Sequence, residues 1–188
     1  MAVQKKLYTV EEFEQFADLP DHRNRLLELI NGEIFEKMPT EEHGVISLTI
    51  GSALKQHIKS NNVAGRVGVE IRHRNPTDDH NARIPDVSFR YTDEPAVQKG
   101  SVEAMPDLAV EVLSPDDEYQ DLLEKAHFYL LNGSQLVWLV FPKSRTIGVC
   151  TLLPNGEIKV RTLDINDVLD GGDLLPGFQL AVKEIFDV

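Results

Sequence analysis

The sequence predicts an α/β fold in which residues 1–188 form a single domain, with a mixed central sheet, flanking helices and an added N-terminal hairpin. Three observations predict this class. The composition, with 41% hydrophobic and 27% charged residues, suits a chain that buries one sizeable core. No repeat or long Gly/Ser/Pro linker divides the chain. The strand–helix–strand pattern of residues 108–141 is typical of a right-handed crossover between parallel strands.

The N-terminal segment is expected to contain a short helix and then a hairpin. Thr9–Glu12 has the pattern of a capping box, so a helix should run from there to about Asp18. The strands Arg25–Ile30 and Glu33–Lys37 flank an Asn-Gly pair, whose tolerance of positive φ suits a two-residue type I′ turn. This pattern predicts two antiparallel strands.

A longer helix and two alternating strands are expected next. Thr40 can cap a helix that runs through about Ser60. Its apolar residues recur every four positions, as on a buried helix face: Ile46, Ile50, Leu54 and Ile58. Arg66–Arg74 and Ile84–Tyr91 then alternate apolar and polar residues, a pattern typical of strands.

The second half of the chain completes the predicted sheet. Leu108–Leu113 and Leu136–Phe141 are continuously apolar, as buried central strands are, and Asp116–Leu131 between them has the length and pattern of a helix. Arg145–Leu152 and Glu157–Leu163 indicate a second hairpin, and Leu174–Val188 a closing tail. Both hairpins are expected to add antiparallel edges to the sheet.

Composition excludes several classes of protein. The longest strongly apolar run has six residues, against about 20 needed to span a bilayer, so no membrane association is expected. The N-terminus lacks the apolar stretch of a signal peptide, and the single cysteine, Cys150, has no partner for a disulfide or zinc site. These features predict a cytoplasmic protein in which Cys150 is a small buried hydrophobe.

The net charge of −12 is unusual for a protein that holds nucleic acid through phosphate contacts. Any basic surface must therefore be local. The segment Arg66–Arg90 is the least acidic part, with five arginines against four acids, whereas Thr162–Val188 has six acids and one lysine.

Two carboxylates occur where the pattern predicts a core. Asp86 opens a strand, on the face opposite Val87 and Phe89. Glu111 lies within a segment that is otherwise apolar on both faces, and a buried ionised carboxylate is costly unless it is paired or binds a metal. Carboxylates on adjacent strands form a hard-oxygen site suited to Mg²⁺ or Mn²⁺.

The predicted crossover helix carries Asp121 and Lys125 one turn apart. If this helix packs on the strand that precedes it, Lys125 reaches toward Glu111. A lysine there would position or activate the attacking water and stabilise charge on a phosphoryl oxygen. Metal-dependent hydrolysis of a phosphodiester uses this chemistry.

The spacing of Pro85-Asp86 and Glu111 resembles the core of the PD-(D/E)XK nucleases, and a series of ordered blocks resembles the Uma family more closely. These blocks are Leu27–Glu33, His43, Pro85–Phe89, Pro106–Pro115, Asp121 with Lys125 and Tyr129, Val137–Val140 and Leu175–Phe178. Members of this bacterial family, formerly a domain of unknown function, are described as candidate restriction endonucleases. The resemblance covers about residues 8–186 and implies a restriction-endonuclease-like core.

The resemblance also implies roles for individual residues. Asp86, Glu111 and the backbone carbonyl of Val112 would be metal ligands. Leu113 stands where the superfamily has its lysine, and Lys125 resembles a migrated replacement. The family also places an acid near the site at the position of Glu28.

Each of these residues has an ordinary alternative role. Asp86 could be a turn residue after proline, and Glu111 could form a surface salt bridge on a half-exposed strand. Asp121 and Lys125 could form an i,i+4 ion pair on the helix surface. Glu28 could face solvent in its hairpin, and His43 could be a capping or surface histidine.

The first functional hypothesis is a Mg²⁺- or Mn²⁺-dependent endonuclease acting on DNA in the cytoplasm. The alternative is a nuclease-fold module that binds nucleic acid or protein with little or no cleavage, which the acidic charge favours. RNA or a small nucleotide is a third substrate option. The oligomeric state stays open, although duplex-cutting enzymes often act as homodimers. Cleavage specificity and physiological role also stay open.

Overall fold

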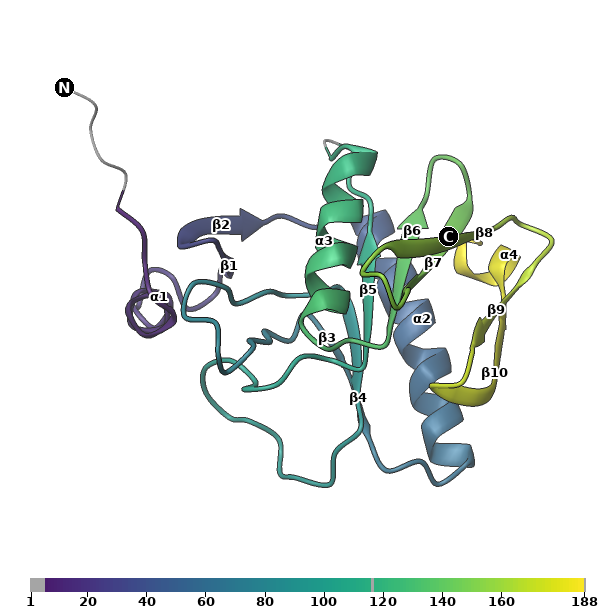
Figure 1. Ribbon diagram of the computed structural model, residues 1–188, viewed down its shortest axis with the longest axis horizontal. Coiled ribbons are helices and arrows are strands. Elements are labelled where there is room, and N and C mark those ends of the chain that lie inside the picture. Colours follow the sequence, from purple (N-terminus) through teal and green to yellow (C-terminus); the bar gives the residue numbers. More distant parts are fainter. Residues whose placement is uncertain (1–5, 116, 188) are drawn as a thin grey trace.

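Six strands form the central sheet of the computed structural model, which describes residues 6–115 and 117–187 (Figure 1). In spatial order they are β3 (Arg66–Val69), β4 (Val87–Arg90), β5 (Leu108–Val112), β6 (Leu136–Phe141), β7 (Thr146–Leu152) and β8 (Ile158–Leu163). β5 and β6 are parallel, and the other neighbouring pairs are antiparallel. The predicted mixed sheet with its parallel crossover is therefore confirmed.

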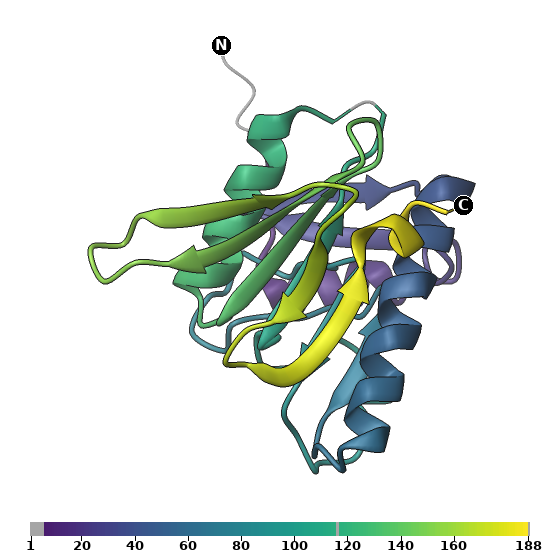
Figure 2. The ribbon, with the colours of Figure 1, turned by 90° about the vertical axis from the view of Figure 1, so that its right-hand side faces the viewer.

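One long helix covers each face of this sheet (Figure 2). α2 (Glu41–Ser60) packs its four predicted apolar residues against Val87, Phe89 and Leu108. α3 (Tyr119–Leu131) packs on the other face, against Ala109 and the inward residues of β6. α3 begins at Tyr119, where Glu118 and Asp121 form a capping box, and the earlier start expected at Asp116 lies outside the described residues. None of the described helices is both long and apolar enough to cross a membrane.

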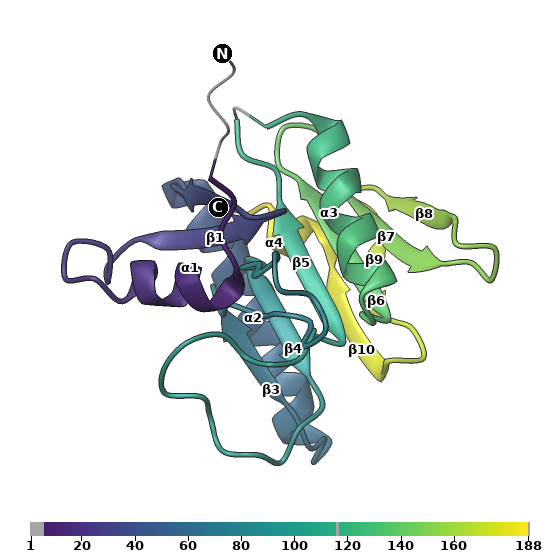
Figure 3. The ribbon, with the colours of Figure 1, turned by 60° about the vertical axis from the view of Figure 1, so that its left-hand side comes forward.

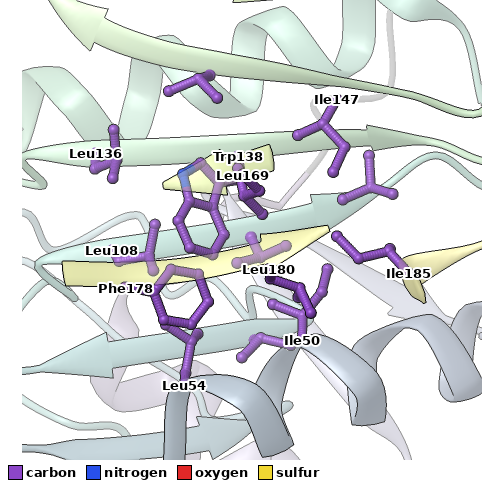
Figure 4. Packing of buried hydrophobic residues seen from close by; sticks show 14 of the residues in the cluster. Ile50, Leu54, Leu108, Leu136, Trp138, Ile147, Leu169, Phe178, Leu180 and Ile185 are labelled. Carbon is purple, nitrogen blue, oxygen red and sulfur yellow. The ribbon is translucent and has the colours of Figure 1, made fainter. Parts of the chain in front are cut away.

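The C-terminal segment has more structure than the tail expected from the sequence. β9 (Val168–Gly171) and β10 (Leu175–Ala181) form a two-stranded sheet, followed by α4 (Val182–Ile185). The Pro-Gly pair that predicted a turn lies inside β10, and an irregularity in the register between Leu175 and Gln179 accommodates it. This unit closes the core on the α2 face, where the Phe178 ring stacks on Trp138 with 5.5 Å between centroids (Figure 4).

The N-terminal hairpin forms from β1 (Leu26–Ile30) and β2 (Glu33–Lys37), with α1 (Val10–Ala17) beside β1 (Figure 3). Asn31 and Gly32 have φ of 51° and 82°, as a type I′ turn requires. The prediction that this hairpin extends an edge of the main sheet is wrong. β1 and β2 form a sheet of their own, because their apolar side chains pack with α1 in a separate small core.

The first two strands of the main sheet are shorter than predicted, and the difference positions the site. β3 ends at Val69, because Glu70 takes a left-handed φ of 54° and turns the chain away. The chain returns to the sheet at β4, which begins at Val87, so Asp86 lies directly before the strand. The Asp86 amide donates a hydrogen bond of 2.9 Å to the Val110 carbonyl and is thereby fixed against β5.

Candidate active site

Asp86 is buried, with only 1% of its surface exposed. One carboxylate oxygen, Oδ2, accepts a hydrogen bond of 2.6 Å from the Val112 amide. Main-chain and side-chain bonds therefore both hold the residue against β5. Asp86 does stand at a strand entry after Pro85, as in the turn-residue alternative, but its carboxylate is in addition buried and bonded to β5.

Glu111 is equally buried, at 1% exposure, in the middle of β5. Its side chain points to α3, where Oε1 accepts a hydrogen bond of 2.8 Å from the Tyr129 hydroxyl and Oε2 one of 3.1 Å from Lys125 Nζ. The exposed-strand alternative for Glu111 is wrong. Lys125 contacts Glu111, as expected if α3 packs on the strand before it, whereas Asp121 accepts a hydrogen bond from the Glu118 amide at the helix start.

Lys37 joins the two carboxylates, and sequence reasoning missed it. Its Nζ lies 2.6 Å from Asp86 Oδ1 and 3.7 Å from Glu111 Oε2, and it donates a 2.8 Å hydrogen bond to the Ile84 carbonyl. The side chain is 12% exposed. A single lysine at the end of a hairpin strand gives no sequence signal, because only the packing of the hairpin against the segment before β4, at Ala82 and Ile84, brings it here.

Glu28 and His43 also lie at this site. Glu28 is buried in β1 and accepts a hydrogen bond of 2.6 Å from the Ile84 amide, so the solvent-facing alternative is wrong. His43 is buried in the first turn of α2, and Thr40 rather than His43 provides the helix cap. His43 Nε2 lies 2.8 Å from Asp86 Oδ2, an ion-pair distance without the geometry of a regular hydrogen bond.

An open cavity of about 650 Å³ gives access to these groups. Its lining includes residues of the hairpin, α2, β5 and α3, among them Glu28, Lys37, His43, Val112, Asp121 and Lys125. Asp121 therefore borders the cavity but makes its described contact at the helix cap. Asp86 and Glu111 do not line the cavity themselves, but they contact three residues that do: Lys37, His43 and Lys125.

Burial and charge shape the ionisation of these groups. Burial opposes ionisation of Asp86, but Lys37 and His43 outweigh it and lower the pKa of Asp86 from 3.8 to about 2. Burial also opposes the charge of Lys37, yet Glu111 and Asp86 raise its pKa above the ordinary lysine value. Glu111 likewise raises the pKa of Lys125. Both lysines therefore stay charged at neutral pH.

Two other groups have raised pKa values. Burial raises the pKa of Glu28, because the charged carboxylate loses its hydration. Burial and the neighbouring Glu111 raise the pKa of Tyr129 well above the ordinary tyrosine value. The Tyr129 hydroxyl thus keeps its proton and remains a hydrogen-bond donor to Glu111.

The donor chemistry fits a divalent cation. Within the described residues, no group of three or more His, Cys, Asp or Glu side chains is arranged to hold a metal ion. Mg²⁺, however, commonly uses only one or two protein carboxylates and keeps several waters. Asp86 and Glu111 supply two hard oxygens that already contact one common cation, the Lys37 ammonium.

Comparisons with known proteins agree with this fold. A family model described as "Uma2: Putative restriction endonuclease" matches residues 10–183. The fold is similar to a crystal structure described as a putative nuclease belonging to DUF820 from Anabaena variabilis ATCC 29413. That match has 24% identity and a TM-score of 0.75 over 95% of this chain and 97% of the other. No curated protein matches the chain.

Proposed function

Because the chain belongs to the Uma2 family, we propose that it is a Mg²⁺- or Mn²⁺-dependent endonuclease that hydrolyses DNA phosphodiester bonds. The family and the fold support a nuclease, and membership confirms the resemblance drawn from the sequence. One observation carries the finer proposal. Asp86 and Glu111, buried on neighbouring segments of the sheet, contact one common cation beside a second ammonium, that of Lys125.

The metal would be held by the carboxylates of Asp86 and Glu111 and by the backbone carbonyl of Val112. When bound, a divalent cation lowers the pKa of water and offsets the charge of the scissile phosphate. Asp86 is oriented for this by the Val112 amide, and Glu111 by the Tyr129 hydroxyl. Both carboxylate ligands are thus held in place before a metal binds.

Lys125 would act on the substrate. Its side chain is 21% exposed and lines the cavity, and Glu111 orients its ammonium at 3.1 Å. A fixed positive charge at this position stabilises the negative charge that develops on the phosphoryl oxygens during attack by water. Since Glu111 keeps the lysine charged, its role is electrostatic and requires no proton transfer.

DNA is the proposed partner. Because the net charge is −12, we expect DNA binding to depend on a divalent cation that neutralises the carboxylates of the site. A homodimer would place two such sites on the two strands of a duplex. Cleavage of both strands of a duplex would use such a homodimer.

A plasmid cleavage assay tests the proposed function. Supercoiled DNA is incubated with the protein in Mg²⁺, Mn²⁺, Ca²⁺ or EDTA. Nicked or linear product is expected with Mg²⁺ or Mn²⁺, and no product with EDTA. The variants Asp86→Asn and Glu111→Gln keep the side-chain shape but remove a ligand charge, so each should reduce cleavage by about 100-fold or more.

Asp93→Asn is the matched control, because it makes the same chemical change at an exposed residue after β4. It should cleave like the wild type. Product that persists in the Asp86→Asn and Glu111→Gln preparations would identify a contaminating nuclease and contradict the proposal.

A nuclease-fold binding module with little or no cleavage is the second candidate. The observation that favours it is the Lys37 ammonium, which pairs with Asp86 at 2.6 Å and completes the site without a metal. Such a module would bind nucleic acid or protein equally well in EDTA and in Mg²⁺. The cleavage assay and a binding titration under both conditions distinguish the two candidates.

A further inference from the structure

The Lys37 ammonium occupies a particular electrostatic position in the site. It lies 2.6 Å from Asp86 Oδ1 and 3.7 Å from Glu111 Oε2. Lys125, by comparison, is within ion-pair distance of Glu111 only, among the contacts of the described residues. Lys37 is therefore the cation that joins the two carboxylates.

The charge balance explains why such a cation is needed. Asp86 and Glu111 are both buried, and two neighbouring buried carboxylates repel each other unless a positive charge separates them. Glu28, which is also buried, adds a third acidic group whose charge raises the pKa of Lys37. Without Lys37, this cluster would keep one ammonium for three acidic side chains.

A third contact anchors Lys37 independently of the carboxylates. Its Nζ donates a hydrogen bond of 2.8 Å to the Ile84 carbonyl, and its stem comes from the last residue of β2. The N-terminal hairpin thus delivers a fixed positive charge to carboxylates that belong to the central sheet. This placement gives the hairpin a function beyond packing.

We propose that Lys37 is the counter-ion that holds Asp86 and Glu111 together in the metal-free protein, and that a divalent cation displaces its ammonium from these carboxylates when it binds. The inference rests on the proposed metal-dependent function. An ammonium and a divalent cation compete for the same carboxylate oxygens, and their like charges disfavour simultaneous occupation. Lys37 therefore sets the metal affinity of the site as well as its stability without metal.

Calorimetric titration with Mn²⁺ tests this inference on the full chain, using wild type, Lys37→Met and Lys37→Arg. Met keeps much of the length of lysine but removes the charge, so Lys37→Met should bind Mn²⁺ about tenfold or more tightly than wild type. Lys37→Arg keeps the charge, so its Mn²⁺ affinity should stay close to that of wild type. Lys37→Met should also have a lower melting temperature in EDTA and a larger rise on adding Mn²⁺.

A second measurement serves if Lys37→Met fails to fold. In ¹⁵N-labelled wild type, the Lys37 side-chain signal, assigned with Lys37→Arg, should shift as Mg²⁺ is added and reach a plateau, as expected for binding at one site. The proposal is overturned if that signal does not move at saturating Mg²⁺, or if wild type and Lys37→Met bind Mn²⁺ equally. In either case the metal-dependent function stands. Absence of Mn²⁺ binding to all three proteins would overturn both.

Discussion

Tyr129→Phe should lower stability through the loss of one hydrogen bond, and the structure allows its size to be estimated. The substitution removes only a hydroxyl from a fully buried ring in α3. That hydroxyl donates a hydrogen bond of 2.8 Å to Glu111 Oε1. The ring and its packing against the sheet are retained, so no large cavity forms.

The expected cost is that of a hydrogen bond to a buried charge. Such bonds contribute about 1.5–3 kcal/mol, against about 1 kcal/mol for a bond between neutral groups. Tyr129→Phe should therefore lower the free energy of unfolding by about 2 kcal/mol. For a domain of this size, that loss corresponds to a fall in melting temperature of about 4–8 °C.

A double-mutant cycle with Glu111→Gln isolates the charge-assisted part. In the Glu111→Gln background the hydroxyl faces a neutral amide oxygen, so removing it should cost only about 1 kcal/mol. The four proteins are compared by urea unfolding with linear extrapolation. Tyr119→Phe is the control, since that tyrosine is exposed and stacks on Phe141, and it should change stability by less than about 0.5 kcal/mol.

The protonation state of Tyr129 adds a second check. Burial and Glu111 raise its pKa well above the ordinary value, so the hydroxyl donates throughout the neutral and mildly alkaline range. The cost of Tyr129→Phe should therefore be constant between about pH 6 and pH 9. A cost below about 0.5 kcal/mol, or the same cost with and without Glu111→Gln, would refute this account of how Glu111 is oriented.

Three further predictions concern the charges of the site. Lys125→Ala should lower Mg²⁺-dependent plasmid cleavage by about 100-fold or more, whereas calorimetry should show that Mn²⁺ binding is retained. Unchanged cleavage would make Lys125 a structural ion-pair partner of Glu111. At fixed ionic strength, Ca²⁺ should strengthen the DNA binding of wild type but not that of the double variant Asp86→Asn/Glu111→Gln. In EDTA, the double variant should bind DNA better than wild type. Equally weak wild-type binding with and without Ca²⁺ would argue against DNA as the substrate. The pKa of Asp86 falls from 3.8 to about 2 on folding, so its contribution of about 2 kcal/mol is present above about pH 4 and lost as the pH falls through about 2. Urea unfolding across this window should show a steeper loss for wild type than for Asp86→Asn, which has no carboxylate to protonate. A wild-type loss no steeper than that of Asp86→Asn would count against the ion pairing.

The local elements could be predicted from the sequence because their signals lie within a few residues. The capping box at Thr9, the Asn31-Gly32 turn and the four-residue spacing of α2 each specify a local conformation. Asp86 and Glu111 could be singled out for the same reason, since each is a carboxylate in a short segment of apolar residues. Their low exposure agrees with that reasoning.

Elements that depend on distant partners could not be predicted in the same way. β9 and β10 were missed because their strand pairing tolerates a Pro-Gly pair and is stabilised by packing on Trp138. The early end of β3 was missed because nothing near Val69 marks it, apart from the left-handed conformation that Glu70 adopts.

The charged residues of the site show the same difference between features with a local sequence signal and features that depend on distant partners. The sequence alone indicated that Glu111 belongs to the core, because the segment around it is continuously apolar, and that Asp86 opens a neighbouring strand. Only the tertiary structure decided which cations they meet. Lys37 is 49 residues from Asp86 along the chain and reaches it because the hairpin, a separate sheet, packs against the segment that leads into β4. Electrostatic pairing depends on distance in space, and a lone lysine on a strand has no pattern that reveals its partner.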